Sequence, residues 1–394
     1  MGFLWDRVEV ENIYQHILKT EGEKHPLYSS EKMEECADYI LSELKSYGLD
    51  TSVHEFSVDG FDYTFRNVEG AIGDGNGPEL LIVSHYDTVR HAPGANDNGS
   101  AIAVMLESAR LLSEANLEGN VSFVSFNLEE GNPALGQHFR DSAQSLGLSD
   151  EEGRYQSWHT TSIMRKWSAI LVKLTYAGNN LETAMTMAIN ELKDELTTNE
   201  LALLEGDIPH FKGISRTNWP GSSALMGSSA WAMKAITEKN DIIGVLCLET
   251  MGYTSKAPNS QKFPEQIDPG MFETYGTQEN LTVGDFLAII GDVNSKSLAD
   301  SFCKHSRQES ITLPYAFLKA DITYEQAAMA MPDILRSDHA PFWRENIPAL
   351  LLTDTADFRY PYYHTAADTI DKLDFDILAK ICKATIATAI ELCT

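Results

Sequence analysis

Two stretches of the chain carry side chains that bind metal ions, although they lie far apart in the sequence. The first stretch contains His85, Asp87, Asp97, Glu129 and Glu130, and the second contains Tyr363 and His364. Two imidazoles and several carboxylates make up the mixed nitrogen and oxygen donor set that suits Zn²⁺. If the two stretches meet in the fold, the pattern predicts a metal-dependent hydrolase.

Apolar runs place the first stretch at the ends of β-strands. Glu79–Val83 is a compact apolar run typical of a buried strand, and it leads into His85. Val121–Leu128 predicts the next strand, which leads into the glutamate pair, and Ser100–Leu112 between them has the spacing of a helix. Because α/β sheets bind their ligands at the carboxyl ends of the strands, we expect these residues to lie close together.

Each motif of the first stretch has a structural and a chemical interpretation. His85 and Asp87 alternate along a strand and therefore share a face, so that His85 could ligate a metal while Asp87 orients it. Asp97 lies in a glycine-flanked turn, where Asp is common as a helix cap, but a carboxylate there can also bridge two cations. Glu129 and Glu130 are adjacent and point in different directions, so one can ligate while the other acts as general base.

Strands alternate with helices along most of the 394 residues. Further helices are predicted at Ser30–Tyr47 and from about Phe375, and further strands at Thr51–Val58, Tyr63–Ile72, Ile242–Leu248, Phe286–Ile290 and Ile347–Thr353. This alternation predicts an α/β fold with a mostly parallel central sheet and helices on both faces. We expect one catalytic domain over residues 1–394, interrupted by an insertion.

Residues 132–225 form the expected insertion. They contain helical patterns at Thr161–Leu174 and Leu181–Leu196 and no clear central strand, which predicts a largely helical segment directly after the glutamate pair. One interpretation is a lid, or an oligomerisation element that would make the protein a homo-oligomer. The other interpretation is a structural appendage that never contacts substrate.

The charge balance limits the partners of the protein. The chain has 58 Asp and Glu against 30 Lys and Arg, a net charge of -28, which favours solubility and repels phosphate backbones and anionic lipid. We therefore expect neither a nucleic acid nor a membrane partner. The N-terminus lacks the basic start and apolar run of a secretory signal, and no apolar stretch is long enough to cross a bilayer, so we expect a cytoplasmic protein.

The motifs, taken together and in this order, resemble the di-zinc aminopeptidase family of zinc exopeptidases. That family is related to bacterial leucyl aminopeptidase and includes glutamate carboxypeptidase and the glutaminyl cyclases. Besides the residues above, the resemblance continues through Ser337–Phe342, Ile347–Leu350 and the run from Tyr363 to Thr369. It covers about residues 75–131 and 227–375, and it implies the zinc-exopeptidase fold.

The resemblance implies two Zn²⁺ ions per chain, with Co²⁺ or Mn²⁺ as substitutes. One ion would be held by His85 and Glu249 and the other by Glu130 and His364, with Asp97 bridging the two. This chain departs from the family at one of the ligands, because Glu249 stands where an Asp is usual. It also places 118 residues between Glu130 and Glu249, far more than the family norm.

The resemblance also implies the catalytic roles. Glu129 would be the general base, Asp87 would hold His85 from behind, and Tyr363 is a candidate donor to the developing oxyanion. The expected activity is that of an aminopeptidase, which removes N-terminal residues from peptides by means of a water activated between the two zincs.

Three alternatives remain on the same scaffold. A carboxypeptidase or N-acyl amino-acid hydrolase needs a cation for the substrate carboxylate, and Arg336 or Arg359 could supply it. A glutaminyl cyclase-like acyltransferase needs only one zinc, which the full set of ligands disfavours. A non-catalytic interaction protein is expected to have lost ligands or Glu129, and none is missing.

Overall fold

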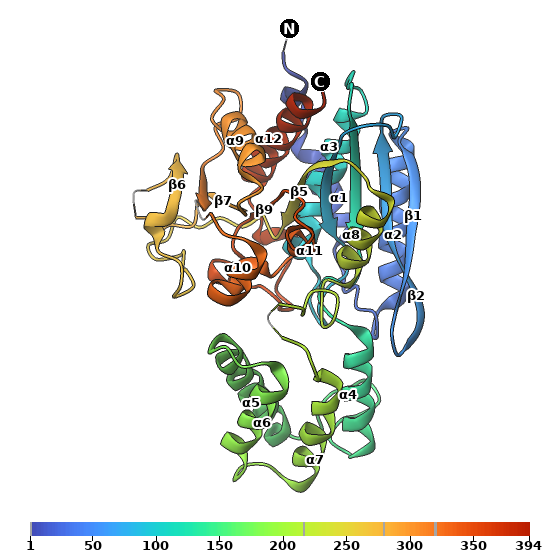
Figure 1. Ribbon diagram of the computed structural model, residues 1–394, viewed down its shortest axis with the longest axis vertical. Coiled ribbons are helices and arrows are strands. Elements are labelled where there is room, and N and C mark those ends of the chain that lie inside the picture. Colours follow the sequence, from blue (N-terminus) through green and yellow to red (C-terminus); the bar gives the residue numbers. More distant parts are fainter. Residues whose placement is uncertain (1, 216, 279, 319–320) are drawn as a thin grey trace.

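A nine-stranded sheet runs through the main body of the computed structural model, which describes residues 2–215, 217–278, 280–318 and 321–394 (Figure 1). The strands are β1 (Asp50–Val58), β2 (Phe61–Ile72), β3 (Glu79–His85), β4 (Asn120–Phe126), β5 (Ile242–Glu249), β6 (Phe272–Tyr275), β7 (Leu287–Gly291), β8 (Tyr315–Leu318) and β9 (Ala349–Thr353). Their order in the sheet is β1-β2-β4-β3-β5-β9-β7-β8-β6. The strands that lead into His85, the glutamate pair and Glu249 are therefore neighbours.

The expected α/β fold is confirmed, but the sheet is mixed rather than mostly parallel. Strands β4, β3, β5 and β9 pair in parallel at the centre, as do β7 and β8. The pairings β1–β2, β2–β4, β7–β9 and β6–β8 are antiparallel. The parallel centre is the part that matters for ligands, because it brings the carboxyl ends of three ligand-bearing strands to one edge.

Helices cover both faces of the sheet, as expected. One face packs against α1 (Val10–Thr20), α2 (Ser30–Ser46), α3 (Ala101–Leu112), α9 (Lys296–Ser306) and α12 (Phe375–Cys393), and the other against α8 (Met226–Glu238), α10 (Tyr324–Ala330) and α11 (His339–Arg344). Successive side chains of a strand point to opposite faces of the sheet, so each strand can pack against both layers of helices. In β3, Leu80 and Ile82 face the first layer of helices and Leu81 and Val83 face the second, and all four are fully buried.

The insertion is a separate group of helices, and it lies below the main body in Figure 1. It comprises α4 (Pro133–Ser145), α5 (Trp158–Tyr176), α6 (Leu181–Leu192) and α7 (Thr198–Asp207). Each helix begins after a side chain that caps it, namely Asn132, Ser157, Asn180 and Thr197. The helices bury a core of their own, which includes Trp167 and Leu203.

Short turns of helix complete the chain. They are η1 (Leu4–Arg7), η2 (Ala95–Ser100), η3 (Ile208–Phe211), η4 (Pro269–Met271), η5 (Pro332–Leu335), η6 (Ala356–Phe358) and η7 (Ile370–Lys372). In the part of the chain that the structure describes, no helix combines the length and the apolar character that a membrane span requires.

Candidate metal centre

Five segments of the chain meet at the carboxyl edge of the central strands and bring the predicted site residues together. They are the end of β3, the η2 turn, the loop after β4, the end of β5 and the loop between η6 and η7. They supply His85, Asp97, Glu129 with Glu130, Glu249 and His364, respectively. Both halves of the site that the sequence separates by more than 200 residues are therefore adjacent in the fold.

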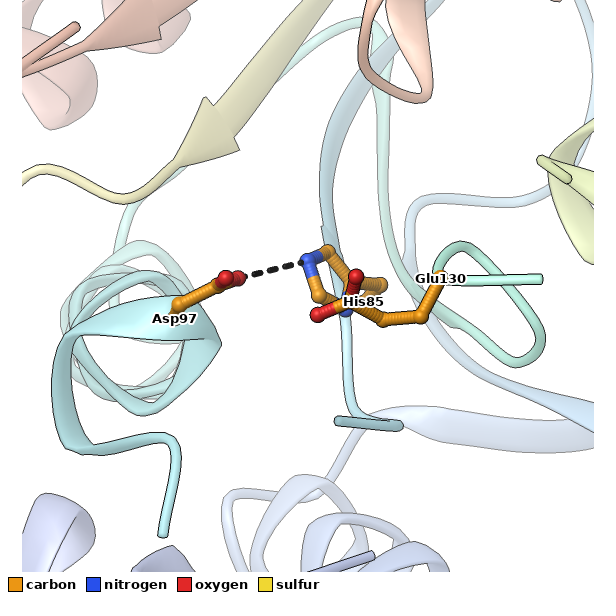
Figure 2. A group of neighbouring side chains, drawn as sticks. All are labelled: His85, Asp97 and Glu130. Carbon is orange, nitrogen blue, oxygen red and sulfur yellow. Dashed lines mark ion pairs between the residues drawn. The ribbon is translucent and has the colours of Figure 1, made fainter. Parts of the chain in front are cut away.

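The first half of the cluster surrounds the imidazole of His85, which is buried at the end of β3. Its Nε2 atom lies 3.3 Å from Asp97 Oδ1 and 3.3 Å from Glu249 Oε2. The nearest oxygen of Glu129 is 4.0 Å away. Figure 2 shows His85 between Asp97 on one side and Glu130 on the other.

The second half surrounds His364. Its Nε2 atom lies 3.1 Å from Asp97 Oδ2 and 3.2 Å from Glu130 Oε2. Asp97 therefore directs one carboxylate oxygen to each of the two imidazoles, His85 and His364. A carboxylate that bridges two cations needs this arrangement.

The donor atoms fit metal ions in both number and chemistry. Donor atoms of His85, Asp97 and Glu130 lie within 4.8 Å of one another, and so do those of His85, Glu129 and Glu249. His85 Nε2 and Glu130 Oε1 are buried without a hydrogen-bond partner, a state that costs free energy unless a ligand compensates for it. Imidazole nitrogen and carboxylate oxygen are donors that Zn²⁺ accepts.

The electrostatics of the cluster favour a cation. Burial raises the pKa of Glu129 well above its usual value and also raises that of Glu130. Burial also acts to raise the pKa of Asp97, but hydrogen bonds from His364 and His85 outweigh it and hold that pKa below the usual range. Four carboxylates packed against two imidazoles leave an excess of negative charge that bound cations would neutralise.

Asp87 lies behind the cluster and holds more than the histidine. Its Oδ1 atom is 3.5 Å from His85 Nδ1, close to the predicted arrangement. Its two carboxylate oxygens accept hydrogen bonds from the backbone N–H groups of Glu129, at 3.0 Å, and Glu130, at 3.1 Å. Asp87 therefore also fixes the turn that presents the glutamate pair.

A second supporting carboxylate, Asp368, received no role from the sequence. It accepts hydrogen bonds from the backbone N–H groups of Asn96 and Asp97, at 2.9 and 3.2 Å, and from the hydroxyl of Tyr360 at 2.7 Å. Asp368 therefore fixes the η2 turn, which carries Asp97. The sequence offered one indication of this role, since Asp368 lies four residues after His364 in the same motif.

Hydrogen bonds from neighbouring side chains hold Glu249, and the sequence motifs did not predict them. The hydroxyl of Ser337 donates to Glu249 Oε2 at 2.9 Å, and the hydroxyl of Thr250 donates to Oε1. Asn98 ties the same strand end to the η2 turn, because its amide donates to the carbonyl of Leu248 at 3.1 Å. These contacts orient the longer glutamate side chain toward His85.

Tyr363 lies beside the cluster, next to an apolar pocket. Its ring stacks on His364 with centroids 3.8 Å apart, and burial raises its pKa well above the usual value. The pocket has a volume of about 80 Å³ and is lined by Tyr363, Glu249 and four phenylalanines. These are Phe263, Phe272, Phe286 and Phe358.

The two arginines proposed for a substrate carboxylate both have partners in the protein, although Nη2 of Arg359 has none among the described residues. Arg336 lines the same pocket, and its guanidinium pairs with Asp357 at 3.0 Å and Asp333 at 3.7 Å. Arg359 is buried and donates to Gln261 Oε1 at 2.7 Å and to the carbonyl of Phe286 at 2.6 Å. The partners of these two guanidiniums are residues outside the metal cluster.

Among the remaining histidines, His339 is the one that the family motifs bring near the site. It is fully buried, its Nε2 atom lies 2.7 Å from the carbonyl of Ile334, and its ring packs edge-on against Trp343. His339 therefore packs in the core of the second layer of helices and contributes no atom to the cluster.

The chain matches the protein-family model described as Peptidase family M28. The match covers residues 67–160 and 222–389, which include all of the clustered residues. The stretch between the two matched segments contains most of α5 and all of α6 and α7.

Two curated proteins illustrate the similarity in sequence. The chain is 24% identical over 362 residues to the uncharacterized protein YfbL of Escherichia coli, with 89% of this chain and 78% of the relative covered. It is 33% identical over 150 residues to aminopeptidase YwaD of Bacillus subtilis, with 36% and 32% covered.

Solved structures show the likeness in fold. The LapA aminopeptidase of Legionella pneumophila superposes with a TM-score of 0.57 at 16% identity, covering 99% of this chain and 73% of that one. The glutaminyl cyclase of Porphyromonas gingivalis superposes with a TM-score of 0.55 at 14% identity, covering 98% and 99%. The same fold thus carries both a peptidase and a cyclase.

Proposed function

Because the chain belongs to peptidase family M28, we propose that it is a zinc-dependent aminopeptidase that hydrolyses the N-terminal residue from peptides. The observation that carries the proposal is the carboxylate of Asp97, which directs one oxygen to His85 and the other to His364. A site for a single ion has no need of a second imidazole on the far side of that carboxylate.

Two Zn²⁺ ions would be held by separate pairs of residues. His85 and Glu249 would hold one, and Glu130 and His364 the other, with Asp97 between them. When bound, the ions lower the pKa of a water molecule and polarise the scissile carbonyl.

Glu129 moves the proton in this proposal. Its carboxylate faces the cluster 4.0 Å from His85 Nε2, and Asp87 fixes its backbone by accepting the Glu129 N–H. It accepts a proton from the attacking water and returns it to the amine that leaves. Tyr363, stacked on His364 beside the cluster, donates its hydroxyl to the oxyanion that forms.

The surroundings of the cluster favour a free N-terminal amine with an apolar side chain. The free amine would bind one of the ions or a carboxylate of the cluster, and the adjoining pocket with its four phenylalanines would accept an apolar side chain. A carboxypeptidase would need an available guanidinium beside the cluster, whereas Arg336 pairs with Asp357 and Arg359 is buried against Phe286. A cyclase would need only one ion.

Hydrolysis of leucine p-nitroanilide tests the proposal. The expected results are activity that a chelator removes, recovery when Zn²⁺ is added back, and no cleavage of N-acetyl-leucine p-nitroanilide. Cleavage of the acetylated substrate but not of the free one would overturn the aminopeptidase assignment and favour an N-acyl hydrolase. Elemental analysis of the same samples gives the number of ions per chain, for which we expect two.

A further inference from the structure

A second cavity, between the insertion and the main body, has a basic lining in an acidic protein. It has a volume of about 550 Å³ and is lined by four arginines, Arg90, Arg140, Arg154 and Arg165. None of its lining residues in the described part of the chain is Asp or Glu, although the protein has 58 of these against 30 Lys and Arg. We call this cavity the arginine cleft.

Two of the four guanidiniums have capacity left for a ligand. Arg165 is exposed on α5 and makes no ion pair with another described residue. Arg140, on α4, has a buried Nε without a hydrogen-bond partner, and its nearest carboxylate, on Asp141, is 3.8 Å away. Neither guanidinium makes a close ion pair with another described residue, so both keep N–H groups that an anion can accept from.

The other two arginines are held in place. Arg154 pairs with Asp150 and Glu152 at 2.7 Å each. Arg90 donates to the carbonyl of Gly153 at 3.2 Å and stacks on the ring of Tyr28, 3.9 Å from its centroid. Arg90 contributes positive charge to the cleft, whereas the charge of Arg154 is neutralised by its two carboxylate partners.

Aromatic side chains add a packing surface beside the charge. Trp158 begins α5, lines the arginine cleft and is 86% exposed, the most exposed of the large apolar side chains that the structure describes. Tyr155 and Tyr28 line the same cavity. Trp, Tyr and Arg are the residue types that are enriched at binding surfaces.

The linings of the arginine cleft and of the metal cluster meet at a third cavity. This cavity, of about 180 Å³, is lined by Glu130 and Asp87 and also by Arg90 and Gly136, which line the arginine cleft too. An extended molecule bound at the cluster could therefore continue through this cavity into the arginine cleft.

From this arrangement we propose that the arginine cleft binds the C-terminal carboxylate of the peptide whose N-terminal residue is held at the metal cluster. The proposal rests on the function proposed above. A planar guanidinium matches the two oxygens of a carboxylate, and a charge-assisted hydrogen bond of this kind is stronger than a neutral one. Holding both ends selects short peptides, because an extended chain advances only about 3.5 Å per residue.

Paired substrates test the proposal. A series from Leu-Ala to Leu-Ala-Ala-Ala-Ala is compared with the same peptides carrying a C-terminal amide. At the length that spans the two sites, we expect KM to be about tenfold lower for the free acid than for the amide, with kcat nearly unchanged. The preference is expected to weaken as salt is added.

Variants assign the effect to the cleft. The double variant Arg140→Gln with Arg165→Gln is expected to abolish the difference between acid and amide while leucine p-nitroanilide is hydrolysed as before. Lys166→Gln is the matched control, because Lys166 follows Arg165 on α5 but pairs with Glu195 and lines no part of the cleft. The control is expected to keep the full preference.

Binding without turnover separates this proposal from the proposed function. N-acetyl-tetraalanine and its amide are titrated by calorimetry against the unsubstituted protein and the double variant. Tighter binding of the acid that the double variant loses supports the cleft even if no anilide is hydrolysed. Anilide hydrolysis with equal KM for acids and amides at every length overturns the cleft and leaves the aminopeptidase standing. Tighter binding of phenyl phosphate than of the peptide acid would reassign the cleft to phosphate.

Discussion

Glu129 and Glu130 are neighbours in sequence, yet they face different parts of the cluster. Glu130 Oε2 lies 3.2 Å from His364 Nε2, while Glu129 lies 4.0 Å from His85 Nε2. The rule that adjacent side chains diverge was enough to predict two roles for the pair. The roles themselves came from the family resemblance. The family match confirms the resemblance, and the roles of the two residues stay predictions.

Glu129→Gln tests the proton-transfer role. The amide keeps the size of the side chain but cannot accept the proton, so we expect kcat to fall by at least about 10³-fold, within the range that general base catalysis supplies. Metal content measured by elemental analysis should stay at two ions per chain. An active variant would remove Glu129 from the mechanism.

Glu249 is the proposed ligand with the least usual side chain, and it deserves a separate test. Glu249→Ala removes the oxygen that lies 3.3 Å from His85 Nε2, so we expect one bound ion per chain instead of two. Glu249→Asp retains the charge on a side chain one methylene shorter and should bind the second ion more weakly than the unsubstituted protein. Two tightly bound ions in the alanine variant would show that Glu249 is not a ligand.

At the scale of elements, the turn that carries Asp97 is held by a hydrogen bond from its backbone N–H to Asp368, which lies 271 residues away in the sequence. Asp368→Asn places an amide group against donors, so we expect about 1–3 kcal/mol less stability and about 10–100-fold weaker metal binding. Denaturant unfolding and zinc titration measure the two effects. The control Asp371→Asn removes an exposed carboxylate that bonds Lys372 and should change neither.

Element by element, the sequence predicts the central strands best. Apolar runs such as that in β3 need no partner to be recognised, and the observed bounds lie within a few residues of the predicted ones. The four-residue strands β6 and β8 were missed, because such short strands carry little periodicity. The antiparallel pairing of β7 with β9 was also missed, since strand direction depends on the course of the connecting chain.

The support of the site was less predictable than its ligands. Asp87 and His85 are two residues apart, so their contact follows from local geometry. The bonds from Asp368 to the η2 turn depend on how distant segments pack, which no local pattern encodes. The arginine cleft has the same origin, because its four arginines come from separate loops and helices.

For the whole molecule, the insertion has a core separate from that of the sheet. Leu203→Ala opens a cavity in that core, where Leu203 is 1% exposed, so we expect the insertion to lose about 2–5 kcal/mol of stability. Hydrogen exchange should show lost protection in α4–α7 with β3–β5 unchanged. Met187→Ala, at a side chain that is 43% exposed on α6, is the control.

Loss of protection in the central strands would contradict this separation, because it would mean that the two cores unfold together. A homo-oligomer formed through the insertion, a lid role and a cytoplasmic location stay predictions. Size-exclusion chromatography of the Leu203→Ala variant would reveal whether the insertion holds copies together.

The donors of the cluster are spread from position 85 to position 364, and this spacing has a consequence for how the protein matures. During synthesis, a growing chain holds only one imidazole of the pair until residue 364 has been added. Contacts between such distant residues form late, because the long loop must close before the contact stabilises it. If His364 is a metal ligand as proposed, the ion that it holds with Glu130 would be among the last to bind during folding.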